Sequence, residues 1–170
     1  MLSYTIYAPP MGVLGLVLAG LIFLFIARQP AGNELMQSLA ASIHEGAMVF
    51  LKREYSILAV FIVVVFVLLS LGIGLYTALA FLGGTLCSMF AGYFGMNAAT
   101  RANVRTSEAA QSHGQNQALT VAFFGGTVMG LSVASLGLLG VGVFFLIFAD
   151  SSPATISGFA MGASSIALFA

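Results

Sequence analysis

The sequence predicts an all-α fold, a polytopic transmembrane helix bundle. Of 170 residues, 60% are hydrophobic and only 6% are charged, with a mean hydropathy of +1.08, whereas about a quarter of the residues of a soluble domain are charged. Apolar stretches long enough to cross a bilayer recur along the chain between short polar links. The formal net charge is zero, which gives no reason to expect nucleic acid as a partner. We therefore interpret residues 1–170 as part of a single membrane domain in a lipid bilayer.

Five spans are expected from the apolar stretches. The first follows Pro9 and Pro10, which are tolerated at a helix start, and ends at Arg28. It has no basic residue before its apolar core, which is the wrong polarity for a secretory signal. By length and hydropathy the spans cover about residues 11–27, 57–75, 77–100, 119–148 and 154–170.

Between the first two spans, residues 33–55 have the pattern of an amphipathic helix. Asn33 is a plausible N-cap, and Glu34 places a negative charge in the first turn. Leucine or another apolar residue recurs every four positions from Leu35 to Leu51. This helix would lie on the membrane surface or pack beneath the bundle. His44 is expected to be solvated, and because Met48 stands where a zinc-protease motif needs its second histidine, that motif is excluded.

The spans differ in their content of small residues, through which helices approach closely in lipid. The middle of the second span contains none, so we expect it at the lipid-facing periphery, touching its neighbours little. The third span should pack on a broad face. Its two adjacent stripes of small residues are Ala80, Gly84, Ser88 and Gly92, and Gly83, Cys87, Ala91, Gly95 and Ala99. A further stripe in the fourth span consists of Gly126, Gly130 and Ala134.

The third helix should continue into the polar link and stop near Gly114. Arg101 and Arg105 are four residues apart and share a face, and Glu108 can fold back onto Arg105. Two interpretations of these arginines are open. They anchor the helix at the membrane interface and fix its orientation, or they are cytoplasmic-face charge contacts to a phosphate-bearing substrate or a neighbouring catalytic loop.

The basic residues indicate the orientation. If five spans alternate in direction, both basic links lie on one side, and the opposite side carries Asp150. Short links rich in lysine and arginine remain in the cytoplasm, which places the N-terminus outside the cytoplasm. The basic residues of these links are Arg28, Lys52, Arg53, Arg101 and Arg105.

The sequence contains no motif that would carry chemistry. Aspartate, glutamate, lysine, arginine and histidine are absent from the centre of every expected span, although pumps and transporters place such groups where ions cross. A Walker A loop and a metal-binding cluster are also absent, so neither catalytic residues nor metal ligands are assigned. The spans have the character of a scaffold.

Three segments resemble the membrane-bound, ion-translocating inorganic pyrophosphatases, which pump protons or sodium ions. The segments are Ile43–Tyr55 (IHEGAMVFLKREY), Gly95–Ala110 (GMNAATRANVRTSEAA) and Gly158–Ala170 (GFAMGASSIALFA). The second is the most specific, and the resemblance covers essentially the whole chain. It implies an all-helical homodimer of about sixteen spans per chain in two concentric rings, of which this chain would be the N-terminal part.

The resemblance also implies an activity and its cofactors. The family hydrolyses pyrophosphate at the cytoplasmic face and couples this to outward transport of protons or sodium ions. Mg²⁺ is required, and some members need K⁺. The family's acidic magnesium–pyrophosphate motifs have no counterpart here, so the fragment alone is expected to be inactive. Only Ser164 matches a position near the family's ion pathway, and helix packing is an equal alternative for it.

A second hypothesis is a stand-alone small membrane protein, a scaffold or interaction subunit without enzymatic activity. It predicts that the gene stops after Ala170, whereas the first hypothesis predicts a continuation rich in glycine and then in aspartate.

Overall fold

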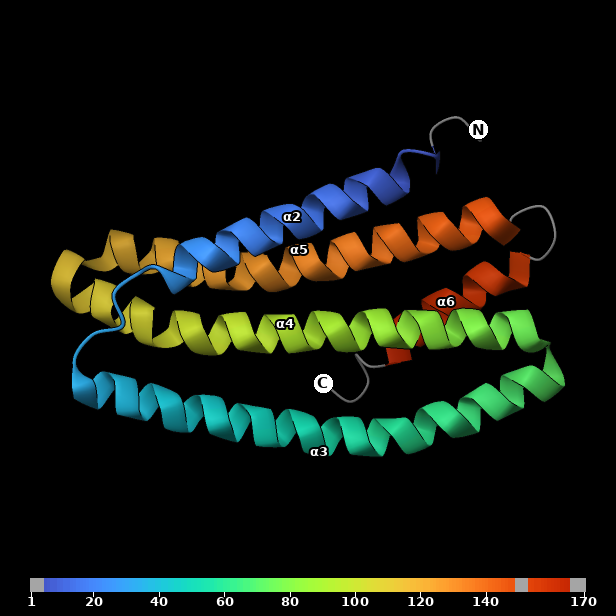
Figure 1. The fold of residues 1–170 in the computed structure, drawn as a ribbon, viewed down its shortest axis with the longest axis horizontal. Coiled ribbons are helices and arrows are strands. Elements are labelled where there is room, and N and C mark those ends of the chain that lie inside the picture. Colours follow the sequence, from blue (N-terminus) through green and yellow to red (C-terminus); the bar gives the residue numbers. More distant parts are fainter. Residues whose placement is uncertain (1–4, 149–152, 166–170) are drawn as a thin grey trace.

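The computed structural model describes residues 5–148 and 153–165, which fold into long, roughly parallel helices (Figure 1). No strand occurs within these two ranges. The helices are α2 (Ala8–Ala27), α3 (Glu34–Gly72), α4 (Leu75–His113), α5 (Gln115–Phe148) and α6 (Pro153–Ser165).

The helix ends follow local sequence signals. The side chain of Asn33 accepts a hydrogen bond from the backbone N–H of Met36 at 2.9 Å, which confirms the predicted N-cap of α3. The predicted stop at Gly114 is also confirmed, since α4 ends at His113 and Gly114 has a φ of +85°. Gly74, in the short link between α3 and α4, has a φ of +143°, a backbone conformation that residues with a Cβ rarely adopt.

The expected helices and the observed ones differ in two places. The sequence predicts separate helices over residues 33–55 and 57–75, but α3 runs through both without a break because no glycine or proline stands between Gly46 and Gly72. The described part of α6 covers only the first part of the expected fifth span, and residues 166–170 lie outside the described residues. Within the described part of the chain, four helices are long and apolar enough to cross a membrane, namely α2, α3, α4 and α5.

Helix α4 lies at the centre of the arrangement. It packs against α5, α6 and α3 and makes a smaller contact with α2, whereas α2 packs mainly on α5 (Figure 1). Helix α3 lies along the outer side of α4 and follows almost its whole length (Figure 1).

Small residues bring α4 and α6 into direct backbone contact. A Cβ on Gly84 would meet the carbonyl oxygen of Phe159, and a Cβ on Gly162 would meet the carbonyl oxygen of Phe81. Between α4 and α5, a Cβ on Gly95 would lie 2.6 Å from Cγ of Met129. The predicted role of the small stripes of the third span in close packing is therefore confirmed for Gly84 and Gly95.

Helix α3 is peripheral, as the lack of small residues in the middle of the expected second span predicted. One face packs on α4 through an apolar cluster of Leu58, Ile62 and Leu69 with Ala78 and Phe81. The opposite face is open, and residues such as Val60, Val63 and Leu68 are more than half exposed. The contact with α4 is more extensive than the sequence indicated, because the expected second span packs through Leu58, Ile62 and Leu69 and the contact reaches back to His44 in the amphipathic half.

The small residues of α5 are used differently from the prediction. Gly126, Gly130 and Ala134 are exposed, and a Cβ on either glycine would have no neighbour within 4 Å. The buried small residues of α5 are instead Ala118, Gly125, Ser132, Ser135, Gly140 and Gly142. The helix is therefore rotated so that its predicted stripe faces away from the described helices.

Candidate functional site

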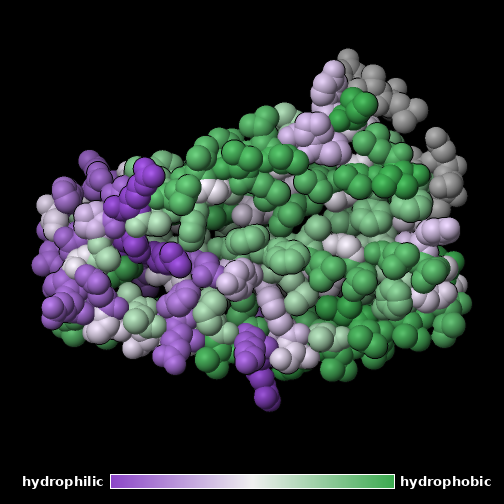
Figure 2. Space-filling model, viewed as in Figure 1, coloured by the Kyte–Doolittle hydropathy of each residue, from purple (hydrophilic) through white to green (hydrophobic). Residues whose placement is uncertain are grey.

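Hydrophilic residues gather at one end of the bundle, where α4 and α5 meet and where α2 ends and α3 begins (Figure 2). The rest of the visible surface is mainly apolar (Figure 2). This polar end carries the two arginines singled out from the sequence and is the candidate functional region of the described residues.

Arg105 is fixed to the end of α2. Its Nε donates to the carbonyl oxygen of Gln29 and its Nη2 to that of Ala27, both at 3.1 Å. Its Nη1 donates to the carbonyl oxygen of Arg101, one turn back on α4, at 2.9 Å. The last carbonyls of a helix have no partner within the helix. Arg105 satisfies one such group, the carbonyl of Ala27, and also the carbonyl of Gln29 just beyond α2. It places a positive charge at the negative pole of that helix.

Arg101 and Glu108 do not form the arrangement expected around Arg105. The guanidinium carbon of Arg101 lies 5.3 Å from the ring centroid of Phe23, a cation–π contact with α2. Oε1 of Glu108 accepts a hydrogen bond from the hydroxyl of Ser112 at 2.6 Å. The expected Arg105–Glu108 pair is therefore wrong, because Arg105 turns back toward α2 instead of forward along its own helix.

His44 and Tyr55 connect α3 to α4. Nδ1 of His44 lies 2.9 Å from the hydroxyl oxygen of Thr100, and the hydroxyl of Thr100 also donates to the carbonyl oxygen of Met96 at 2.9 Å. The hydroxyl of Tyr55 donates to the carbonyl oxygen of Met89 at 2.6 Å. The expectation of a solvated His44 is wrong, since the uninterrupted α3 places its ring half-buried against α4.

A polar hollow of about 230 Å³ lies beside Arg105, where this side chain meets the end of α2. Its wall includes Gln29, Arg105, Glu108, His113 and Gln117, from the α2–α3 link, α4 and α5. Arg105 and Glu108 balance in charge and already have partners, and His113 and Gln117 are exposed. The hollow has no nucleophile paired with a base, so we assign it no catalytic role.

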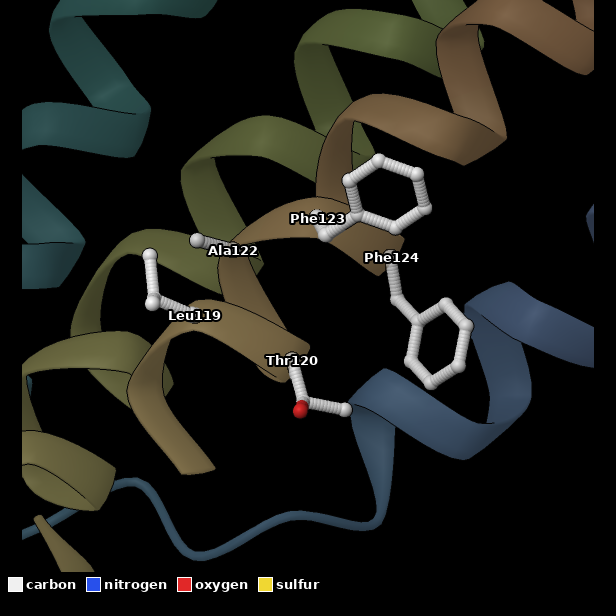
Figure 3. Close-up of a pocket in the computed structure, with 5 residues that line it drawn as sticks. All are labelled: Leu119, Thr120, Ala122, Phe123 and Phe124. Carbon is white, nitrogen blue, oxygen red and sulfur yellow. The ribbon is translucent and has the colours of Figure 1, made fainter. Parts of the chain in front are cut away.

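A second hollow, near the start of α5, is lined by residues of that helix alone (Figure 3). It is a shallow depression, because Leu119, Ala122 and Phe123 are all exposed. Phe124 turns toward α2, where its ring meets that of Phe25 at a centroid distance of 5.4 Å (Figure 3). The one polar side chain, Thr120, donates to its own helix at the carbonyl of Asn116. This hollow has no chemistry to offer a substrate.

Ser164 lies on the exposed side of α6. Its hydroxyl donates to the carbonyl oxygen of Ala160 at 2.9 Å, within its own helix. The buried side of α6, with Gly158, Phe159 and Gly162, packs on α4 and α5. Ser164 and the two arginines therefore lie in separate parts of the bundle and do not form one site.

The described residues do not fit a magnesium site. Mg²⁺ is held by carboxylate oxygens, and within residues 5–148 and 153–165 no group of three histidine, cysteine or acidic side chains comes together. The glutamates of this part of the chain, Glu34, Glu45, Glu54 and Glu108, are spread over α3 and α4.

These features define the class of the protein. Four long apolar helices, packed through glycines and bearing polar groups at one end, characterise an integral membrane protein with an all-α bundle. Residues 13–170 match the family described as inorganic H+ pyrophosphatase. The chain belongs to this family.

The names of curated relatives describe pumps for different ions, sodium ions in some and protons in others. The chain is 51% identical over 168 residues to a putative K(+)-stimulated pyrophosphate-energized sodium pump of Clostridium tetani. This alignment covers 99% of the present chain and 25% of the relative. It is 41% identical to a K(+)-insensitive pyrophosphate-energized proton pump of Methanosarcina mazei, over 96% of this chain and 24% of the relative. A K(+)-stimulated pyrophosphate-energized sodium pump of Thermotoga maritima is 36% identical. The chain thus spans about a quarter of the length of these relatives.

Proposed function

We propose that this chain is the N-terminal part of a membrane pump that hydrolyses pyrophosphate at the cytoplasmic face. Hydrolysis would drive outward transport of protons or sodium ions. The match of residues 13–170 to the pyrophosphatase family carries this proposal. The names of the relatives supply the substrate and the two candidate ions.

Within such a pump, the described helices would be scaffold and not catalytic machinery. The centres of their apolar segments hold no ionisable side chain that could relay an ion. Phosphoryl transfer needs metal ions, carboxylates to hold them and positive charge at the transferred group. Mg²⁺ would therefore be bound by the part of the whole protein that this chain does not contain, as would K⁺ if it is required.

The arginines have a structural role in this proposal. The hydrogen bonds of Arg105 to the end of α2 support the anchoring interpretation over contact with a phosphate-bearing substrate. Ser164 remains the one candidate for the ion pathway. Its exposed position, away from α4 and α5, supports contact with helices of the rest of the protein. We also propose a homodimer, with the basic residues on the cytoplasmic side and the N-terminus outside the cytoplasm.

The whole protein in sealed inverted vesicles provides the test. We expect hydrolysis of pyrophosphate only with Mg²⁺, accompanied by ion uptake that stops when pyrophosphate is omitted. A protonophore would abolish uptake of protons, and a sodium ionophore would abolish uptake of sodium ions. Comparing hydrolysis with and without K⁺ would distinguish a K⁺-stimulated pump from a K⁺-insensitive pump. Vesicles that contain the folded protein and neither hydrolyse pyrophosphate nor accumulate ions would refute the proposal.

A further inference from the structure

We propose that a continuous face of α5 is the docking surface for a helix of the same polypeptide that lies beyond residue 170. We call this face the α5 seam. It consists of Leu119, Phe123, Gly126, Gly130, Val133 and Gly137. The inference rests on the proposed function in one respect, that the whole protein continues as its relatives do.

The spacing of the α5 seam is that of a helix-packing surface. Its residues follow one another at alternating intervals of four and three, which keeps them on one side of a helix. Two large residues, Leu119 and Phe123, occupy the polar end, and glycines dominate the remainder. Small residues at this spacing allow the backbone of a second helix to approach closely.

The described helices leave most of the α5 seam open. The side chains of Leu119, Phe123 and Val133 are 59%, 73% and 51% exposed. A Cβ on Gly126, Gly130 or Gly137 would have no neighbour within 4 Å. On α4 and α6, by contrast, Gly84, Gly95 and Gly162 each lie in close contact with a neighbouring helix.

Lipid is a poor explanation for this surface. Glycine in a helix interior costs about 1 kcal/mol relative to alanine. In the buried helix contacts, this cost is offset by close packing. The exposed Gly126 and Gly130 and the half-buried Gly137 would carry the cost without any such gain.

The α5 seam continues into an interface that already exists. Val133 and Gly137, at its far end, line a hollow of about 130 Å³ between α4, α5 and α6. The other walls of this hollow include Cys87 and Ser88 of α4 and Ala163 of α6. A helix lying along the α5 seam would therefore extend the packed α4–α5–α6 contact without a gap.

The rest of the same chain is the occupant that fits best. The chain spans about a quarter of the length of its relatives, so most of the helices of the whole protein are outside the structure. Helix α6, the last described helix, lies beside the far end of the α5 seam. The docking helix should present large apolar side chains opposite Gly126 and Gly130, since those positions leave room.

A photo-crosslink in the whole protein tests the occupant. Phe123 is replaced by p-benzoylphenylalanine, which has a similar shape, and the purified protein is irradiated in liposomes and analysed by peptide mass spectrometry. We expect a crosslink from position 123 to a peptide beyond residue 170 of the same polypeptide. The matched control carries the probe at Leu68, on the open side of α3 and 64% exposed, where we expect lipid adducts.

Three results would overturn the inference. Lipid adducts alone at position 123 would make the α5 seam a lipid-facing surface. Crosslinks only within residues 1–170 would mean that the described helices cover it. In a mixture of isotopically light and heavy protein, crosslinks between light and heavy peptides would identify a second copy as the occupant.

A steric test is independent of crosslinking chemistry. We expect Gly126→Leu and Gly130→Leu to lower the melting temperature of the whole protein, because leucine would fill the space of the docked helix. Gly20→Leu on α2 is the control, since Gly20 is also exposed with no neighbour within 4 Å, but the exposed residues one turn away on either side, Val17 and Leu24, are large. Parent-like melting of both α5 variants would contradict the inference. Both tests report packing, so they remain informative if the protein does not hydrolyse pyrophosphate.

Discussion

At the scale of single residues, Arg105 is the best-defined side chain of the polar end. It makes three hydrogen bonds to backbone carbonyls, two of them at the end of α2. The planar guanidinium directs several donors at once, which an ammonium group on a flexible stem does not. Arg105 therefore fixes the end of α2 against α4, at the point where the chain leaves the apolar part of the bundle.

We expect Arg105→Lys and Arg105→Ala both to destabilise the whole protein. Hydrogen bonds to charged groups contribute about 1.5–3 kcal/mol each. Lysine retains the positive charge but lacks the planar group that directs several donors at once. The loss should appear as a lower melting temperature of the purified protein in detergent. Arg53→Lys, at an exposed position on α3, is the control. Unchanged melting temperatures of both Arg105 variants would argue against a stabilising role of the Arg105 hydrogen bonds to the end of α2.

Tyr55 gives a second prediction at this scale. Its hydroxyl donates a hydrogen bond to the carbonyl oxygen of Met89 across the α3–α4 contact. A Cβ on Gly92 would lie only 3.0 Å from the hydroxyl oxygen of Tyr55. Tyr55→Phe should cost about 0.6–1.5 kcal/mol, the range for such bonds in membrane and soluble proteins. Thermal unfolding would measure this. Tyr76→Phe, where the ring is 64% exposed, should change little, and equal losses for both variants would refute the assignment.

At the scale of helices, α4 is the element on which the others assemble. Its small residues face α6 at Gly84 and α5 at Gly95, and its apolar and hydroxyl groups face α3. Because backbone contact leaves no space for a side chain, the positions of these glycines determine how closely each helix can approach.

Gly84→Ala should be strongly destabilising in spite of alanine's higher helix propensity. The new Cβ would meet the carbonyl of Phe159 and lie 2.8 Å from the amide nitrogen of Ala163, so α6 would have to move. Gly46→Ala, on an exposed turn of α3 with no neighbour within 4 Å, should instead be neutral or stabilising by up to about 1 kcal/mol. The two variants are compared by folded yield and melting temperature. Equal behaviour would contradict the α4–α6 contact.

At the scale of the whole molecule, polar residues are distributed unequally between the two ends of the bundle. Hydrophilic residues gather at the end where α4 and α5 meet, and the visible surface beyond is mainly apolar (Figure 2). The link between α3 and α4 lies at the opposite end and carries no charged residue (Figure 1). By the preference of lysine and arginine for the cytoplasm, the polar end should face the cytoplasm.

Cysteine labelling tests this orientation in the whole protein. Ser38→Cys and Ser107→Cys lie at exposed positions of the polar half, and Leu75→Cys lies at the opposite end. In right-side-out vesicles, a membrane-impermeant thiol reagent should label only Leu75→Cys, with the parent protein as the background. In inverted vesicles the pattern should reverse. Labelling of Ser38→Cys and Ser107→Cys from opposite sides would exclude the proposed topology.

The sequence by itself determined the class of the protein and the limits of most helices. Composition decides that the chain prefers lipid, and local signals such as Asn33 and Gly114 act on backbone groups within a turn of themselves. Such effects need no knowledge of distant residues. The role of the small stripes of α4 was also predictable, because Gly84 and Gly95 within them meet neighbouring helices closely.

Only the tertiary structure decided which residues meet. The sequence showed that α5 has small residues, but its rotation buries Gly125 and leaves Gly126 open. It showed two arginines on one face, but their partners are carbonyls and a ring more than seventy positions away in the chain. Helix ends are set by neighbours in sequence, whereas side-chain partners depend on how separate helices rotate and pack, which no local pattern contains.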